Sequence, residues 1–257
     1  MLYISLTTIP SRIKNLRPVF ESLNNQKTKP DSVILHCPKK CLRINQTYDI
    51  TELKNIANNA YDFNIIINEI PYDYGPISKI YPIINLDYIK PDDMIIVIDD
   101  DRLLNPLFID TLIENFTRWN QKYVIAVSGL LYPTKLGETW HCVWNGSDTQ
   151  IIEGSFGYIL KRDFLDFDFK KWVIEVDDYQ DVIKKKFENS FLVDDNIISR
   201  YLDSKNIRKK VIFSNNHCNK SNVGQLTEMN DPLSGLGSNL DKDYESELEL
   251  RSMGLIK

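Results

Sequence analysis

Short apolar runs alternate with amphipathic stretches along this chain, and that alternation constrains its fold more than any other feature. Short aliphatic runs predict buried strands, and apolar residues three or four positions apart predict helices. We expect strands over 2–6, 32–37, 63–70, 94–98, 123–128, 151–160 (interrupted by Gly154 and Gly157) and 210–213. We expect helices over 17–26, 76–87, 106–119 and 194–203. Such alternation predicts an α/β fold with a mostly parallel central sheet flanked by helices.

The composition is that of an ordinary globular protein. The chain has 257 residues, of which 42% are hydrophobic and 26% charged, enough for one large domain or a domain with an appendage. The 31 Lys and Arg against 36 Asp and Glu give a net charge of −5, without a basic block. The chain is therefore not expected to bind nucleic acid.

The sequence also predicts a cytoplasmic location, which for a viral protein includes the host cytoplasm. The first residues lack the basic start and long apolar run of a signal peptide. The longest aliphatic run, 94–98, is too short to span a bilayer, so no transmembrane segment is expected. The four cysteines are too few for a disulfide scaffold in a chain of this length and are expected to be free thiols.

The most informative local feature is the acidic triplet Asp99, Asp100 and Asp101, directly after the buried run 94–98. In open α/β sheets, ligands bind beyond the carboxyl ends of the strands. Three adjacent carboxylates ionise together only where a positive charge offsets them. Mg²⁺ or Mn²⁺ would supply that charge, because these cations prefer oxygen ligands. The alternative is a solvated acidic turn or a helix-capping cluster.

Two further segments follow predicted strands or turns at the same sheet edge. The segment 5–12 (SLTTIPSR) offers hydroxyls and a guanidinium that can bind a base, ribose or phosphate, or it is a helix-capping loop. The segment 72–79 (YDYGPISK) is a Gly-Pro turn that offers an aromatic face and Lys79 to an anion, or it is an ordinary turn with a surface lysine.

Three later segments also carry polar chemistry. The glycines of 153–158 (EGSFGY) interrupt a strand, which indicates either the close approach of a ligand or a bulge. Asp194 and Asp195 begin a predicted helix, where one caps the helix or serves as a general base. His217 and Lys220 follow the last predicted strand, and they either contact a metal and a phosphate or are structural or solvated residues.

Taken in order, these segments resemble those of the GT-A-fold glycosyltransferases, in particular small bacterial and large-DNA-virus enzymes that begin with LTTIPxR. The matching segments are LTTIPSR at 6–12, DYGPISK at 73–79, VIDDD at 97–101, EGSFG at 153–157 and VDDN at 193–196. The triplet is a version of the family's DxD motif. The resemblance covers about residues 2–220 and implies a GT-A catalytic domain, a Rossmann-like nucleotide-diphospho-sugar transferase fold. Its nucleotide-binding half would span about 1–105 and its acceptor-binding half about 106–220, with 221–257 a tail, a lid or a partly disordered segment.

The resemblance also implies a role for each matching residue. Asp101 would be the main ligand of Mn²⁺ or Mg²⁺, with Asp99 and His217 as further metal ligands. The nucleotide would be bound by Thr7, Thr8, Pro10, Arg12, Tyr74, Gly75, Lys79, Asp99, Asp100 and Lys220. The donor sugar and the acceptor would be bound by Trp140, Trp144, Glu153, Gly154, Ser155, Phe156 and Gly157. Asp195 occupies the position of the catalytic base, which the family writes xED, with Asp194 in place of the glutamate.

These roles imply a metal-dependent inverting glycosyltransferase of hexosyl or deoxyhexosyl groups. The partners would be a nucleotide-sugar donor, UDP- or GDP-linked, and a hydroxyl of a glycan or glycoconjugate. The oligomeric state is open.

Two other functions fit parts of the sequence. In a phosphatase of the haloacid dehalogenase type, Asp99 would be the nucleophile and Asp101 its partner, although Leu103 stands where that class has Thr or Val. In a non-catalytic module that binds nucleotide-sugars or glycans, the 13 Tyr, 11 Phe and 4 Trp would supply stacking surfaces.

Overall fold

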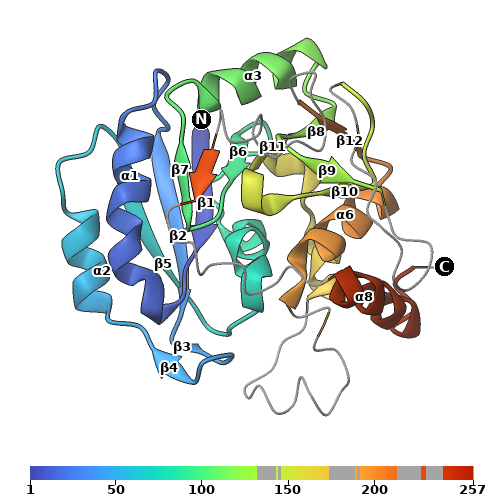
Figure 1. The fold of residues 1–257 in the computed structure, drawn as a ribbon, viewed down its shortest axis with the longest axis horizontal. Helices are drawn as coiled ribbons and strands as arrows, with labels where there is room; N and C mark the ends of the chain where they lie inside the picture. The colour runs from blue at the N-terminus through green and yellow to red at the C-terminus, as the bar shows by residue number, and fades with distance from the viewer. Residues whose placement is uncertain are drawn as a thin grey trace.

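The computed structural model describes residues 1–131, 143, 146–173, 189, 192–212, 227–229 and 240–256 (Figure 1). A central sheet of seven strands has the order β5-β2-β1-β6-β11-β8-β12. Its strands are β1 (Leu2–Thr7), β2 (Ser32–Pro38), β5 (Asn64–Ile70), β6 (Met94–Val97), β8 (Tyr123–Ala126), β11 (Tyr158–Lys161) and β12 (Arg208–Val211). All neighbouring pairs are parallel except those of β11, which runs antiparallel to β6 and β8. The predicted α/β class with a mostly parallel central sheet is confirmed.

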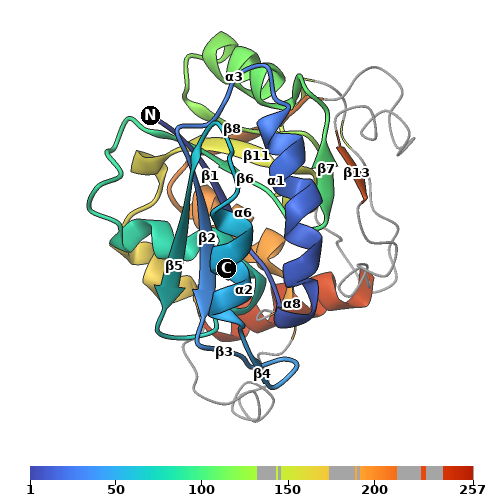
Figure 2. The same ribbon diagram turned by 90° about the vertical axis from the view of Figure 1, so that its left-hand side faces the viewer.

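Helices cover both faces of this sheet, and Figures 1 and 2 show the two layers. One face packs against α1 (Leu16–Asn24), α2 (Ile50–Ala57) and α3 (Phe108–Arg118). The other face packs against the 3₁₀ turns η2 (Gly75–Lys79), η3 (Tyr81–Asn85) and η6 (Phe167–Trp172) and the helices α6 (Asp194–Ser204) and α8 (Leu240–Ser252). Burial on both faces explains why the inner parallel strands β1, β2 and β6 are nearly continuous apolar runs.

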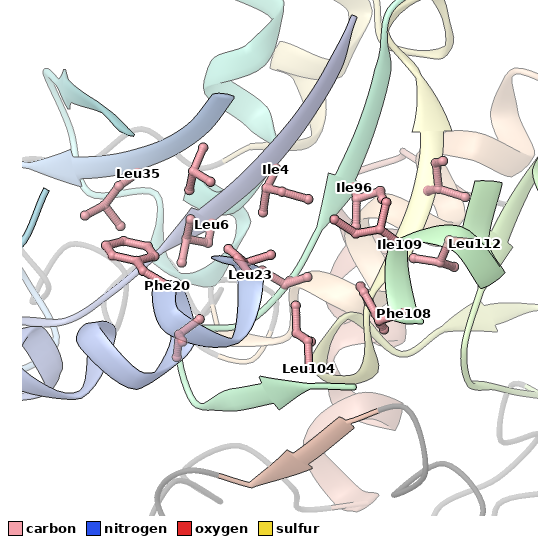
Figure 3. Packing of buried hydrophobic residues seen from close by; sticks show 14 of the residues in the cluster. Ile4, Leu6, Phe20, Leu23, Leu35, Ile96, Leu104, Phe108, Ile109 and Leu112 are labelled. Atoms are coloured by element: carbon pink, nitrogen blue, oxygen red, sulfur yellow. The ribbon is translucent and has the colours of Figure 1, made fainter. Parts of the chain in front are cut away.

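The spacing of apolar residues explains how α1 and α3 pack. In α1, Leu16, Phe20 and Leu23 fall on one face and are buried. In α3, Phe108 and Leu112 do the same. Figure 3 shows the side chains of both helices meeting those of β1, β2 and β6. The expected helices at 17–26 and 106–119 are confirmed, with ends that differ by one or two residues.

The expected helix over 76–87 is wrong, because two short 3₁₀ turns, η2 and η3, occupy this stretch. Pro82 lies at the start of η3 and has no backbone N–H to donate. Ile80 separates the turns with φ −132°, outside the helical range. The apolar spacing of the segment reflects burial of both turns and not an α-helix.

The single strand expected over 151–160 is also wrong. β10 (Ile151–Ile152) pairs with β9 (Gly129–Leu130) in a separate two-stranded sheet, and the turn η4 (Gly154–Phe156) leads into β11 of the central sheet. Gly157 joins η4 to β11 with φ +88°, a conformation that favours glycine.

The late strand expected at 210–213 instead begins at Arg208 and ends at Val211. Its basic residues hide the strand pattern, because Lys209 and Lys210 are buried in ion pairs with Asp203 and Asp148. The strands at 2–6, 32–37, 63–70, 94–98 and 123–128 and the helix at 194–203 are confirmed to within two residues at each end.

Several elements have no counterpart in the sequence prediction. They are α2, β3 (Lys40–Cys41), β4 (Gln46–Thr47), β7 (Arg102–Leu104), β9, β13 (Thr227–Met229), α8, and the 3₁₀ turns η1 (Pro10–Asn15), η5 (Arg162–Phe164) and η6. β13 and α8 belong to the segment 221–257, and α8 packs on α6. Cys37 and Cys41 are buried free thiols, as expected. Among the described residues, no helix is long and apolar enough to cross a membrane.

Candidate functional site

A cleft of about 190 Å³ lies where β1 and β6 end, beside the first residues of α6. The predicted nucleotide-binding residues Thr7, Thr8, Arg12, Gly75 and Lys79 line it. Asp99, Asp100, Asp101 and Asp194 line it as well. Because β1 and β6 are parallel neighbours, their carboxyl ends bring residues far apart in the sequence to one sheet edge.

Asp100 is held by two residues of the loop after β1. Its Oδ1 accepts from Arg12 Nη1 at 2.9 Å, and its Oδ2 accepts from Thr8 Oγ1 at 2.6 Å. Burial raises the pKa of the Asp100 carboxyl to about 6, and Arg12 and Thr8 oppose that rise. The LTTIPSR loop and the acidic triplet are therefore one hydrogen-bonded unit.

Each carboxylate of the triplet lies near a cation of the chain itself. Asp99 Oδ1 is 2.7 Å from Lys79 Nζ. Asp101 lies 3.4 Å from Arg12 Nη1 and 3.8 Å from Arg102 Nε. These cations supply part of the positive charge that we expected a metal ion to provide.

Lys79 ends the turn η2, and its side chain is almost completely buried. Its Nζ lies 2.7 Å from Asp99 Oδ1 and 2.8 Å from Asp194 Oδ2, so it bridges the triplet and α6. Burial opposes the charged form, but Asp194 and Asp99 together raise the pKa of Lys79 well above its usual value. The residue expected to meet an anionic ligand is charged and lies between two carboxylates.

Asp194 and Asp195 occupy the first turn of α6, where the positive end of the helix dipole favours carboxylates. Asp195 Oδ1 accepts from the backbone N–H of Gly154 at 2.9 Å. Burial, and then the charge of Asp194, raise the pKa of Asp195 well above its usual value. Burial also raises the pKa of Asp194, while its ion pair with Lys79 opposes that rise. Both carboxylates are therefore harder to ionise than a solvated aspartate, and Asp194 is the one that pairs with Lys79.

The segment expected to face the donor sugar comes close to this acidic pair. A Cβ atom on Gly154 would lie 2.8 Å from Lys79 Nζ and 2.9 Å from Asp195 Oδ1, so only glycine fits there without displacement. Glu153 accepts a hydrogen bond from Ser128 Oγ, and Ser155 lies within η4. The Phe156 ring lies under the guanidinium of Arg102, 4.5 Å from its centroid. A Cβ atom on Gly157 would lie 2.7 Å from the ring of Phe108.

Two further predicted residues do not line the cleft. Pro10 begins η1, and Tyr74 is buried with its ring 4.7 Å from that of Tyr81, so neither is among the described residues that line the cleft. Trp140, Trp144, His217 and Lys220 lie outside the described residues.

Sequence reasoning assigned no role to several residues that line the cleft: Ile9, Cys41, Arg43, Tyr48, Asp73, Pro76 and Leu192. Tyr48 donates its hydroxyl hydrogen to the Thr8 carbonyl at 2.7 Å. Asp73 accepts from the backbone N–H groups of Leu42 at 2.7 Å and Gly75 at 2.8 Å. The Asp73–Gly75 bond is an Asx turn, which the spacing of Asp before Gly indicates. No comparable pattern indicates that Cys41, Arg43 and Tyr48 line the cleft.

The donor chemistry of the triplet suits a hard divalent cation. Mg²⁺ is commonly held by one or two carboxylates, with substrate phosphates and water completing its shell. Asp99 and Asp101 offer two such carboxylates at the rim of the cleft. Within the described ranges no group of three or more His, Cys, Asp or Glu side chains gathers as a metal site. The described residues therefore fit a cation that is shared with a substrate better than one held by protein alone.

Comparisons with known proteins give fold-level likenesses only. No protein-family model and no curated protein matches the chain. The cytidylyltransferase IspD of Francisella tularensis aligns with 87% of this chain and 95% of its own at 13% identity, with a TM-score of 0.46. TarS 1-349 of S. aureus aligns over 84% of this chain and 59% of its own at 10% identity, with a TM-score of 0.48. Glucosyl-3-phosphoglycerate synthase of Mycobacterium tuberculosis, crystallised with Mn²⁺ and UDP-glucose, aligns over 64% and 57% at 15% identity, with a TM-score of 0.41. Any function of this protein therefore has to be inferred from the residues of the site.

Proposed function

We propose that this protein is a metal-dependent, inverting glycosyltransferase of the GT-A type. It would move a sugar from a nucleotide-diphosphate donor to a hydroxyl group of a glycan or glycoconjugate. One observation supports this most strongly: Lys79 Nζ lies against both Asp194 at the start of α6, next to Asp195, and Asp99 of the acidic triplet after β6. The residues proposed to bind the diphosphate, the acidic triplet, therefore lie next to the residue proposed to accept the proton, Asp195.

The nucleotide side of the proposal uses the loop after β1 and the triplet. Thr7, Thr8 and Arg12 line the cleft, where the guanidinium of Arg12 would donate to the phosphates, and Asp99 would accept from ribose hydroxyls. Asp101 and Asp99, with His217, would hold Mn²⁺ or Mg²⁺. When bound, that cation neutralises the diphosphate so that it can leave.

The proton-accepting side uses Asp195. The acceptor hydroxyl gives its proton to the Asp195 carboxylate as its oxygen bonds to the anomeric carbon of the donor sugar. The bond between that carbon and the diphosphate oxygen breaks at the same time, and the nucleoside diphosphate leaves with both electrons. Attack from the face opposite the leaving group inverts the anomeric configuration. Burial raises the pKa of Asp195, which makes it a stronger base than a solvated aspartate.

A thermal-shift panel tests the donor class. The protein would be melted with UDP-, GDP- and CDP-linked sugars, each with and without MnCl₂, and with MnCl₂ alone. A ligand that binds only the folded state stabilises it and so raises the melting temperature. At a hundredfold excess over its dissociation constant, it adds about 2.7 kcal/mol to the free energy of unfolding. The proposal predicts a rise for UDP- or GDP-sugars that depends on the metal. No rise for any nucleotide-sugar would overturn it.

The same preparation separates the two other functions. A phosphatase with Asp99 as nucleophile would release phosphate from p-nitrophenyl phosphate, whereas the proposed transferase would not. A non-catalytic binding module would show the metal-dependent rise in melting temperature, but it would release no nucleoside diphosphate on prolonged incubation with the donor.

A further inference from the structure

A buried histidine that the proposed reaction does not use lies one strand away from the cleft. His36 is on β2, is fully buried, and has both ring nitrogens engaged. Its Nδ1 lies 2.8 Å from Asn68 Nδ2, and its Nε2 lies 3.0 Å from Ser5 Oγ. Ser5 Oγ in turn donates to the backbone carbonyl of Lys79 at 2.5 Å.

The chemistry of these groups gives the chain of hydrogen bonds one direction. An amide nitrogen such as Asn68 Nδ2 only donates, so His36 Nδ1 accepts. In a neutral ring the other nitrogen, Nε2, then carries the hydrogen and donates to Ser5 Oγ. The Ser5 hydroxyl is left with its hydrogen to donate to the Lys79 carbonyl. Burial lowers the pKa of His36 to about 3, in agreement with a neutral ring.

This chain crosses three neighbouring strands of the sheet. Asn68 and His36 are register partners on β5 and β2, and Ser5 lies on β1. It ends at Lys79, the last residue of η2, whose ammonium group is held by Asp99 on one side and Asp194 on the other. Lys79 is therefore fixed at its main chain and at its side-chain tip.

We infer that Lys79 is the positioning residue that sets the triplet and the α6 carboxylate pair relative to each other, and that Asn68, His36 and Ser5 fix its backbone for that purpose. This inference deepens the proposed function and rests on it. Lys79 has a long, flexible stem, and its ammonium group has a defined place only because both ends are held. A misplacement of about 1 Å at a reacting group can cost on the order of 100-fold in rate.

The hydrogen-bond chain is tested without any substrate by ¹⁵N NMR of the histidine rings. The protein has three histidines, and the signal that disappears in His36→Gln is that of His36. We expect a neutral ring with the hydrogen on Nε2, and a change in that Nε2–H signal in Ser5→Ala. Ser32→Ala, which also removes a buried serine hydroxyl but at the other end of β2, should leave the signal unchanged. If the His36 ring of the wild type carries its hydrogen on Nδ1, the proposed direction of the hydrogen-bond chain is wrong.

The positioning role is tested by kinetics with the donor that the thermal-shift panel selects. Ser5→Ala should lower kcat for nucleoside diphosphate release by about tenfold or more, with the donor KM within about twofold of wild type. Lys79→Met should lower kcat further, and Ser32→Ala should match wild type. A Ser5→Ala enzyme with wild-type kcat would overturn the role.

A failure of Ser5→Ala to fold and a failure of donor binding can both be distinguished from a failure of the positioning role. If Ser5→Ala does not fold, Asn68→Ala takes its place, because Asn68 is the half-buried first donor of the hydrogen-bond chain. This variant should also lower kcat, but by less than Ser5→Ala would. An unchanged kcat would again overturn the positioning role. If no nucleotide-sugar binds the wild type, the proposed function fails and the positioning role fails with it. The NMR result then still decides whether the hydrogen-bond chain exists.

Discussion

At the scale of single residues, the proposed reaction requires that two adjacent carboxylates, Asp194 and Asp195, have different roles. Asp194 is paired with Lys79, while Asp195 accepts a hydrogen bond from the backbone N–H of Gly154, and burial and the charge of Asp194 raise its pKa. Identical side chains with different surroundings can carry different roles in one site. The family resemblance pointed to Asp195, and the charge pairing of Asp194 supports that choice.

Asp195→Asn should leave donor binding intact and lower transfer by about 100-fold or more, because the amide cannot take the proton of the acceptor hydroxyl. The measurement compares the metal-dependent thermal shift with the rate of transfer. Asp194→Asn is the matched variant, and it should also disturb Lys79 because one of its two carboxylate partners is lost. Full transfer activity in Asp195→Asn would exclude it as the base.

Much at this scale could be predicted from local sequence, since Thr8, Arg12, Lys79 and the triplet all line the cleft as expected. Their pairing could not be predicted, because it depends on which strands are neighbours. The ion pair between Lys79 and Asp194 joins residues 115 positions apart, and no local pattern encodes such a contact.

At the scale of elements, the turn η4 matters most, because it brings its first residue against both Lys79 and Asp195. The sequence pattern predicts a single strand over 151–160 that continues through Gly154 and Gly157. Period-two patterns do not show that β10 and β11 belong to different sheets. Likewise, apolar spacing alone suggests a helix over 76–87, whereas Pro82, which has no backbone N–H to donate, lies at the start of a second 3₁₀ turn.

Gly154→Ala should impair transfer more than it impairs folding. The added methyl group would meet the tips of Lys79 and Asp195 at 2.8 and 2.9 Å, and these tips would have to shift. We expect a loss in kcat of about tenfold or more, with a melting temperature close to wild type. A variant with wild-type kcat would show that the contact has no role in the reaction.

α8 is attached to α6 by an ion pair that is largely shielded from water. Arg200 Nε lies 2.9 Å from Glu247 Oε2, and the side chains are 20% and 6% exposed. Arg200→Ala would leave the Glu247 carboxylate without its main partner, at a cost of about 2 kcal/mol in the free energy of unfolding.

Urea denaturation measures this cost, with Arg118→Ala as the control. Arg118 pairs with Glu114 on the exposed surface of α3, and its loss should cost about 0.5 kcal/mol or less. Equal effects of the two substitutions would show that α8 contributes nothing through this pair.

At the scale of the whole molecule, the sheet separates two apolar cores and places the charged cleft at one edge between them. Fully buried polar groups are few in the described part, and His36 is among them. A neutral buried histidine makes global stability depend on pH.

The sign of that dependence follows from the two pKa values of His36. Its pKa is about 3 in the folded protein and 6.5 when unperturbed, so below pH 6.5 only the unfolded chain takes up the proton. His36 thus makes stability fall as the pH drops from about 6.5 toward 3, by about 2 kcal/mol at pH 5. His36→Gln should remove this part of the slope, as measured by urea denaturation at pH 7 and pH 5. An unchanged slope would mean that the histidine is already charged in the folded protein.

The central claim is that the cleft formed by the loop after β1, the acidic triplet and the start of α6 binds the diphosphate of a nucleotide-sugar. Its most direct test is a crystal structure of the protein with Mn²⁺ and the nucleoside diphosphate selected by the thermal-shift panel. We predict electron density for the diphosphate in contact with the triplet, with the terminal phosphate, which carries the sugar in the donor, facing Asp195. Density for the nucleotide at another surface, or an empty cleft at saturating ligand, would contradict it.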